Sequence, residues 1–245
     1  MTARSYFLTR NIYMCLSNGQ FIFLDIEKDR YLSLDRAWTN TIAPALHGWP
    51  SDQQGGSQPS DIKPDSVAEI GSTMVEWGLL TPDRANGKDA RPATIEPPAT
   101  DLVSDEDLDN PGIKVGHLWN FLVASISASI GLRQRSIDNV INLVARRKVR
   151  RQKSGLSNSP GFDFNRARRM VAIFDVLRPF YPRKYLCLYD SLALLEFLAR
   201  YDIYPTWVYG VAAEPFNAHC WVQEASSVFN DSAESVRNYT PIMAV

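Results

Sequence analysis

Short apolar runs separated by turn signals occupy the first part of the chain. The runs cover residues 12–16, 21–25 and 30–35, and Asn18-Gly19 lies between the first two. Asn-Gly between alternating hydrophobic residues is a strong hairpin signal. The pattern therefore predicts a three-stranded antiparallel sheet.

Helical spacing of apolar residues follows that sheet. Asp35 is placed to cap a helix that contains Trp38, Ile42 and Leu46. A second helix is predicted to begin at residue 65 or 66 and to end near Gly78. Three strands with two helices in about eighty residues resemble a winged-helix module.

The second half begins with helices and ends with strands. Apolar periodicity predicts helices at residues 115–132, 136–152, 163–178 and 187–200, and short strands at 206–211, 218–222 and 228–231. Both units together predict the α+β class, with a papain-like C-terminal domain.

Residues 115–132 contain no Asp, Glu, Lys or Arg, and their length is near the lower limit of a membrane span. Leu118, Leu122, Ile126 and Ile130 recur every four residues, as on one side of an amphipathic helix. The spacing favours a buried helix of a soluble protein over a membrane anchor, and the scattered cysteines suit a reducing cytoplasm.

Composition divides the chain into three parts. Residues 81–112 are rich in proline and acidic side chains and lack apolar periodicity, which is typical of a linker. We therefore predict a binding module at 1–84, an acidic linker at 85–112 and a second domain at 113–245. Residues 1–110 carry 9 Lys+Arg against 17 Asp+Glu, whereas residues 111–245 carry 17 against 10. The acidic first part argues against nucleic-acid binding.

Three cysteines in 245 residues do not form a disulfide framework. The histidines and cysteines also lack the spacing of a metal site, so we predict neither a metal nor a cofactor. The basic run at residues 146–153 is consistent with a solvated helix end or with docking of a partner.

Cys187, His219 and Asp231 carry the strongest chemical signal. Cys187 begins a predicted helix, where free N–H groups favour a thiolate. A histidine on a strand can accept the thiol proton, and a carboxylate on the next strand can orient the imidazole. The order predicts a cysteine-nucleophile site.

These residues lie within motifs that resemble a known family. The sequence is similar to the B proteins of lasso-peptide biosynthesis, in the transglutaminase-like cysteine peptidase superfamily, at Cys187-Leu188, Ser191-Leu192-Ala193-Leu194, Gly210-Val211, Pro215-Phe216, Ala218-His219, Trp221-Val222 and Asn230-Asp231. The N-terminal module resembles the leader-recognition element of that family, and also the small peptide chaperones of quinone-cofactor biosynthesis, at residues 21–25 and 31–35.

The resemblance implies a leader peptidase. Cys187 would be the nucleophile, His219 the base and then the acid, and Asp231 the orienting group. The leader of a ribosomally made precursor would add to the sheet as a strand and contact Arg30, Tyr31, Leu32, Ser33, Leu34, Val67, Ile70 and Met74. An asparagine-synthetase-like cyclase, which uses ATP, would then close the macrolactam.

Three positions depart from the family pattern. Asp190 would oppose thiolate formation if its carboxylate lay near the sulfur. Cys220 replaces a more usual alanine, and strand alternation predicts that it faces away from His219 and is packed. Gln223 replaces a frequent glutamate. Two other functions stay open, namely acyl transfer to an amine and a non-catalytic scaffold that only binds the leader.

Overall fold

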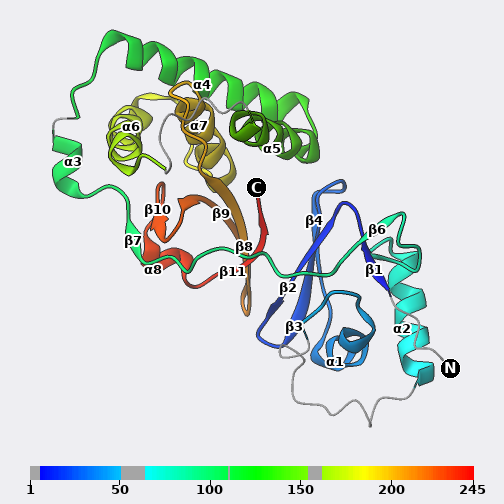
Figure 1. Ribbon diagram of the computed structural model, residues 1–245. Helices are drawn as coiled ribbons and strands as arrows, with labels where there is room; N and C mark the ends of the chain where they lie inside the picture. Colours follow the sequence, from blue (N-terminus) through cyan, green and yellow to red (C-terminus); the bar gives the residue numbers. More distant parts are fainter. Residues whose placement is uncertain (1–5, 51–63, 110, 154–161) are drawn as a thin grey trace. The chain divides into compact units, whose positions relative to one another are not determined.

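A computed structural model describes residues 6–50, 64–109, 111–153 and 162–245, without the side chains of residue 64 and residues 151–153. The chain divides into two compact units (Figure 1). One comprises Met1–Thr94, Val211–Asn217 and Thr240–Met243, and the other comprises Ile95–Gly210, Ala218–Tyr239 and Ala244–Val245.

The N-terminal sheet confirms the three predicted strands. Strands β2 (Ile12–Ser17), β3 (Gln20–Asp25) and β4 (Arg30–Ser33) pair antiparallel in the order β2-β3-β4. Asn18 and Gly19 adopt φ angles of 50° and 76°, as a two-residue turn between right-twisted strands requires.

Helices α1 (Arg36–Ile42) and α2 (Pro64–Glu76) follow. Asp35 caps α1 by accepting a hydrogen bond of 2.8 Å from the Trp38 backbone N–H. The predicted helix through Leu46 is too long, because Pro44 has no N–H and the chain tightens into the 3-10 turn η1 (Ala43–Ala45). Gly78, with φ 77°, follows the end of α2 as expected.

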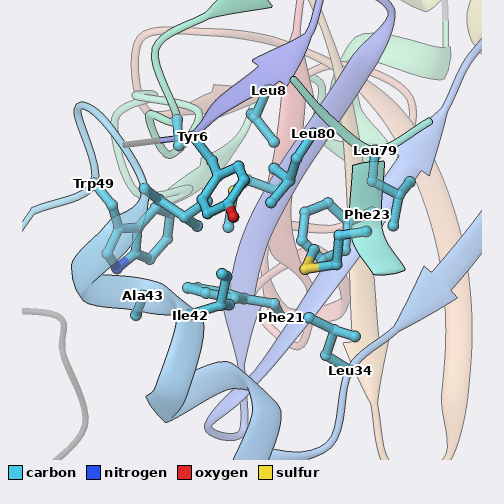
Figure 2. Packing of buried hydrophobic residues seen from close by; sticks show 14 of the residues in the cluster. Tyr6, Leu8, Phe21, Phe23, Leu34, Ile42, Ala43, Trp49, Leu79 and Leu80 are labelled. Atoms are coloured by element: carbon cyan, nitrogen blue, oxygen red, sulfur yellow. The ribbon is translucent and has the colours of Figure 1, made fainter. Parts of the chain in front are cut away.

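The N-terminal unit also contains a second small sheet, which its sequence pattern does not predict. Strand β1 (Phe7–Thr9) lies between β5 (Leu80–Thr81) and β6 (Gly87–Lys88). Figure 2 shows the core behind these strands, where Phe21 meets Trp49 edge-to-face with ring centroids 4.9 Å apart. Residues from both small sheets and both helices contribute to this core.

The segment predicted as a linker contains structure and needs correction. It contributes β6, β7 (Thr100–Asp101) and the short helix α3 (Asp105–Asp109). Ala90 and Leu102 are buried, and the Leu102 N–H donates to the Val228 carbonyl. Two-residue strands need only a backbone partner, so their polar sequences show no periodicity.

Four long helices form one side of the C-terminal unit. They are α4 (Val115–Gln134), α5 (Ile137–Lys153), α6 (Phe164–Leu177) and α7 (Cys187–Ala199). Helix α7 packs against α4 and α6 (Figure 1). The 3-10 turn η4 (Arg178–Phe180) leads from α6 toward the start of α7.

Helix α4 forms as predicted, but the other side of it is buried. The predicted stripe is exposed, from 43% at Leu118 to 48% at Ile126 and Ile130, while Phe121, Ala124, Ser125 and Ala128 are buried. Both sides of this helix are apolar, so periodicity does not define the buried side. The small residues allow close approach of a neighbouring helix. By length and composition α4 meets the criteria for a membrane span, with 22% of the apolar window buried, which alone is weak evidence.

The C-terminal sheet has the strand order β11-β8-β9-β10-β7. Its further strands are β8 (Thr206–Ala213), β9 (Phe216–Glu224), β10 (Ser227–Val228) and β11 (Thr240–Ala244). A small apolar cluster that includes Val208, Trp221 and Val236 lies on this sheet. The mixed helices and strands confirm the α+β class.

Substituting Gly71 tests the packing of α2. A Cβ at Gly71 would lie 2.3 Å from the Tyr6 ring, whereas a Cβ at Gly116 in α4 would meet nothing within 4 Å. Overpacking costs about 1–3 kcal/mol, and alanine improves helix propensity by up to ~1 kcal/mol. We expect Gly71→Ala to lower the urea midpoint and Gly116→Ala to leave it unchanged or raise it. Equal midpoints for the two variants would contradict this packing.

Candidate active site

Cys187 is the first residue of α7. The preceding residue, Leu186, is extended, and its N–H donates to a carboxylate oxygen of Asp190 at 2.7 Å. The first N–H groups of a helix have no partner within the helix, and they stabilise negative charge. The local sequence therefore places the sulfur where a thiolate is favoured.

His219 lies on β9, and Asp231 lies in the loop between β10 and α8 (Ala233–Val236). The prediction that Asp231 lies on a strand is wrong, because β10 ends at Val228 and Ser232 already caps α8. His219 Nε2 and Asp231 Oδ2 are 2.6 Å apart, and the other carboxylate oxygen accepts the Ser232 N–H at 2.7 Å. The carboxylate is thus held from two sides.

The imidazole connects the carboxylate to the thiol. Since Nε2 faces Asp231, the other ring nitrogen, Nδ1, is left for Cys187. Hydrogen bonds from Cys220 and His219 lower the pKa of Cys187 to about 4. Hydrogen bonds with Asp231 and Cys187 raise the pKa of His219 to about 9. Between these values the site holds a thiolate and an imidazolium.

Asp231 is ionised over the same range. Burial alone would raise its pKa, but hydrogen bonds from His219 and from the Ser232 N–H outweigh burial and lower the pKa. A permanent carboxylate therefore faces the imidazolium, as an orienting group requires.

Aromatic rings fix the position of the imidazole. The His219 ring lies 5.1 Å from the Tyr239 ring and 6.0 Å from the Trp221 ring, measured between centroids. Gly210 leaves room for both neighbours, since a Cβ there would lie 2.7 Å from Trp221 and 2.9 Å from Tyr239. The glycine in the Gly210-Val211 motif is thus required for packing at the site.

A buried polar network lies on the inner side of Cys187. Ser191 Oγ donates to the Cys187 carbonyl at 2.6 Å and accepts from Trp207 Nε1 at 2.9 Å. Cys220 is buried, as predicted, and its Sγ lies 3.4 Å from Ser191 Oγ. Its thiol and its backbone N–H also hydrogen-bond Cys187. The prediction that Cys220 is only packed is therefore incomplete.

Asp190 does not act on the thiol as an isolated charge. Its carboxylate pairs with the buried guanidinium of Arg178, which also donates to the carbonyls of Tyr181, Arg183 and Lys184. We call this arrangement the Arg178 clasp. It ties the segment before Cys187 to the first turn of α7.

Gln223 has a structural role in the sheet. Its amide nitrogen donates to the carbonyls of Glu96 and Ala225, and its oxygen accepts from Trp221 Nε1 at 2.9 Å. A glutamate could not donate to those carbonyls. The basic run is also partly structural, because Arg147 pairs with Glu196 and Lys148 donates to Thr206. The side chains of residues 151–153 lie outside the described part.

The predicted leader-binding residues divide into two groups. Leu34, Ile70 and Met74 are buried in the N-terminal core, so these three need correction from contact residues to core residues. Arg30, Tyr31, Leu32 and Ser33 form β4, at the end of its sheet, and Val67 is half-buried on α2. The family resemblance implied both groups alike, because likeness in sequence does not show which side chains the fold buries.

Sequence reasoning missed Arg178, Trp207, Tyr239 and the role of Ser191. None of these residue types indicates a catalytic site by itself, and each acquires its role from the contacts that the fold brings about. Pro179 and Pro182 mark in the sequence that the preceding helix stops before Cys187. In the described residues no group of three His, Cys, Asp or Glu side chains is placed to hold a metal.

Residues 128–244 match the family model of the transglutaminase-like superfamily. The C-terminal part of the chain is thus a transglutaminase-like domain, a class that includes cysteine peptidases and acyltransferases. Neither a curated protein nor a solved structure shows significant similarity to the chain.

The Arg178 clasp can be tested against a matched ion pair. Side-chain exposure is 5% for Arg178 and 16% for Asp190, against 40% for Arg147 and 12% for its partner Glu196, so removing the carboxylate leaves a buried cation unpaired only in the clasp. Breaking a buried pair costs about 3–5 kcal/mol, and an exposed one about 0–1 kcal/mol. We expect Asp190→Ala to reduce the free energy of unfolding by much more than Glu196→Ala, as measured by urea denaturation. Equal losses would show that the clasp is not a buried ion pair.

Alkylation tests the thiolate directly. With a pKa of about 4, Cys187 should react with iodoacetamide at about pH 6, where an ordinary thiol is protonated. His219→Ala should move the pH midpoint of this reaction upward, and His47→Ala, in the other unit, should not. Mass spectrometry of the labelled peptide gives the readout. A wild-type midpoint at about pH 8–9 would contradict the ion pair.

Proposed function

We propose that this protein is a cysteine endopeptidase that removes the leader from a ribosomally made precursor in lasso-peptide biosynthesis. The observation that supports this most directly is the proximity of Cys187, His219 and Asp231 within a transglutaminase-like domain. The resting ion pair supplies a nucleophile and an acid without further activation.

In the resting ion pair the proton is on His219 and not on Cys187, and this determines the first half of the reaction. The Cys187 thiolate attacks the carbonyl carbon of the scissile bond. His219, already protonated, donates its proton to the departing amine, which is the N-terminus of the core. The leader stays attached to Cys187 as a thioester. The histidine thus acts first as an acid, which reverses the order expected from sequence.

The second half restores the thiolate. Neutral His219 accepts a proton from water, and the hydroxide formed attacks the thioester. The Cys187 sulfur leaves, and the leader departs with a free carboxylate. The N–H of Cys187, at the first helical position, is the candidate donor to the developing oxyanion.

The N-terminal module would bring the precursor to this site. Strand β4 pairs with β3 on one side and ends the three-stranded sheet within the described residues. A leader added along Arg30, Tyr31, Leu32 and Ser33, near Val67, would continue the sheet by backbone hydrogen bonds. Tethering raises the local concentration of the cleavage site, so the catalytic cleft need recognise few residues itself.

A separate cyclase would take up the released core. The cleavage produces a free amine but activates no carboxylate, so macrolactam closure requires ATP from an asparagine-synthetase-like partner. The peptidase itself uses no cofactor in this proposal. All these steps are compatible with a reducing cytoplasm, which keeps the thiol available.

Acyl transfer is the second candidate, because the matched superfamily includes acyltransferases. The thioester is common to both reactions, and an amine would replace water as the acceptor. A scaffold that only binds the leader would not require the ion pair at all.

Replacing Cys187 separates these functions. Purified protein is incubated with a precursor peptide encoded by a short neighbouring reading frame, and the products are weighed by mass spectrometry. We expect Cys187→Ala to reduce cleavage by at least about a thousandfold while leaving the precursor bound. Cys15→Ala, which changes a buried cysteine of the N-terminal sheet, should cleave normally.

Other outcomes identify the alternatives. A product joined to an added amine, in place of a free leader carboxylate, would indicate acyl transfer. Precursor that is bound but left uncut by wild type and Cys187→Ala alike would favour the scaffold and end the peptidase proposal.

A further inference from the structure

Cys187 has a second sulfur beside it. The side chain and backbone N–H of Cys220 hydrogen-bond the Cys187 sulfur, although 33 positions separate these residues in the chain. The two residues come from different elements, the N-terminus of α7 and strand β9. Both cysteines are free thiols, and Cys220 is buried whereas Cys187 is only half-buried. An oxidant in solution therefore reaches Cys187 first.

Hydrogen-bond accounting places a proton on Cys220. The only hydrogen of Ser191 Oγ is donated to the Cys187 carbonyl at 2.6 Å, and Trp207 Nε1 donates to the same oxygen at 2.9 Å. Either atom can donate in the 3.4 Å contact between Ser191 Oγ and Cys220 Sγ. Because the thiolate of Cys187 can only accept, the proton between the two sulfurs belongs to Cys220. Cys220 is thus a thiol that always has an acceptor nearby.

The charge states of the two sulfurs differ in the direction that oxidation chemistry requires. The hydrogen bond with Cys187 and burial raise the pKa of Cys220 well above its ordinary value. The partner sulfur is the thiolate of the ion pair. A reactive thiolate beside a protected thiol is the arrangement found in redox-sensing cysteines with a resolving cysteine.

We propose that Cys187 and Cys220 form a redox site, at which a peroxide converts the two thiols to a reversible disulfide that switches off the peptidase. The loss of activity rests on the proposed function, because the disulfide consumes the nucleophile. The formation of the bond does not.

The chemistry has two balanced steps. The Cys187 thiolate attacks hydrogen peroxide, one oxygen is transferred to sulfur as sulfenic acid, and the other leaves as hydroxide and is protonated to water. Cys220 sulfur then attacks the sulfenic sulfur, so the S–S bond forms as the S–OH bond breaks. The hydroxyl group leaves with the Cys220 proton as a second water. A dithiol reverses the result by exchange.

The third cysteine provides an internal control. Cys15 lies on β2 of the other unit, and burial raises its pKa to about 12. It is therefore far less reactive toward peroxide than the Cys187 thiolate. Cys15→Ala should form the Cys187–Cys220 bond to the same extent as wild type.

The sequence makes the bond measurable without any substrate. Tryptic cleavage after Lys184, Arg200 and Arg237 places Cys187 and Cys220 in two separate peptides, and Cys15 falls in a third. The protein is treated with a small excess of hydrogen peroxide, the remaining thiols are alkylated, and the digest is weighed before and after dithiothreitol. We expect the two peptides joined, at about 2 Da less than the sum of their thiol forms, and separated by dithiothreitol.

Two variants of Cys220 remove the resolving sulfur. Cys220→Ser keeps a hydroxyl donor, and Cys220→Ala keeps only the packing. If one of the two variants does not fold, the other still provides the test. In both, the joined peptides should be absent. At higher peroxide concentration, Cys187 should progress to sulfinic acid, which dithiothreitol does not reverse, to a larger extent than in wild type.

The inference is overturned if wild type shows no joined peptides and its Cys187 becomes sulfinic acid as readily as in the variants. It is also overturned if Cys187 joins mainly to Cys15. If wild type cleaves the precursor but peroxide does not form this disulfide, the redox site is refuted and the peptidase proposal stands. Formation of the bond without cleavage would refute the peptidase and leave the thiol pair established.

Discussion

The ion pair between Cys187 and His219 is the interaction on which the chemistry of this protein depends. Neither partner would carry charge at neutral pH to this extent in isolation. The thiolate is stabilised by Cys220 and His219, and the imidazolium by Asp231 and the thiolate. Each charge therefore exists because the other is close, and the site is active or inactive as a unit.

Holding the pair together requires constraints on every participating element. The Arg178 clasp fixes the segment that leads into α7, and Ser191 ties the first turn of α7 to Trp207 on β8. Trp221 and Tyr239 hold the imidazole from its faces, with space provided by Gly210. These contacts touch no reacting atom, but each sets the position of one that reacts. The same closeness that activates the thiol also brings a second sulfur within its reach.

In the N-terminal unit, most apolar side chains form the core and contribute to no candidate catalytic site. Its core is made by strand residues such as Phe21 and Phe23 together with Met74 of α2, so most of the apolar residues in its repeating pattern face inward. The backbone of β4, at the end of this sheet, is available for the strand addition proposed above. A module of this kind can recognise an extended peptide while its own core stays unchanged.

The sequence by itself determined those turns and helix ends that depend on interactions between neighbouring residues. The Asn18-Gly19 turn, the Asp35 cap, the Gly78 stop and the start of α7 at Cys187 depend on residues within a few positions of each other, and short-range sequence records them. The candidate triad of Cys187, His219 and Asp231 could likewise be predicted from the sequence, because few residue types serve as nucleophile, base and orienting acid. Tertiary structure alone decided which side of α4 is buried, that residues 87–88 and 100–101 pair with other strands, and that Cys220 contacts Cys187. These depend on partners brought together from distant parts of the chain, and their free energy is not contained in any local pattern.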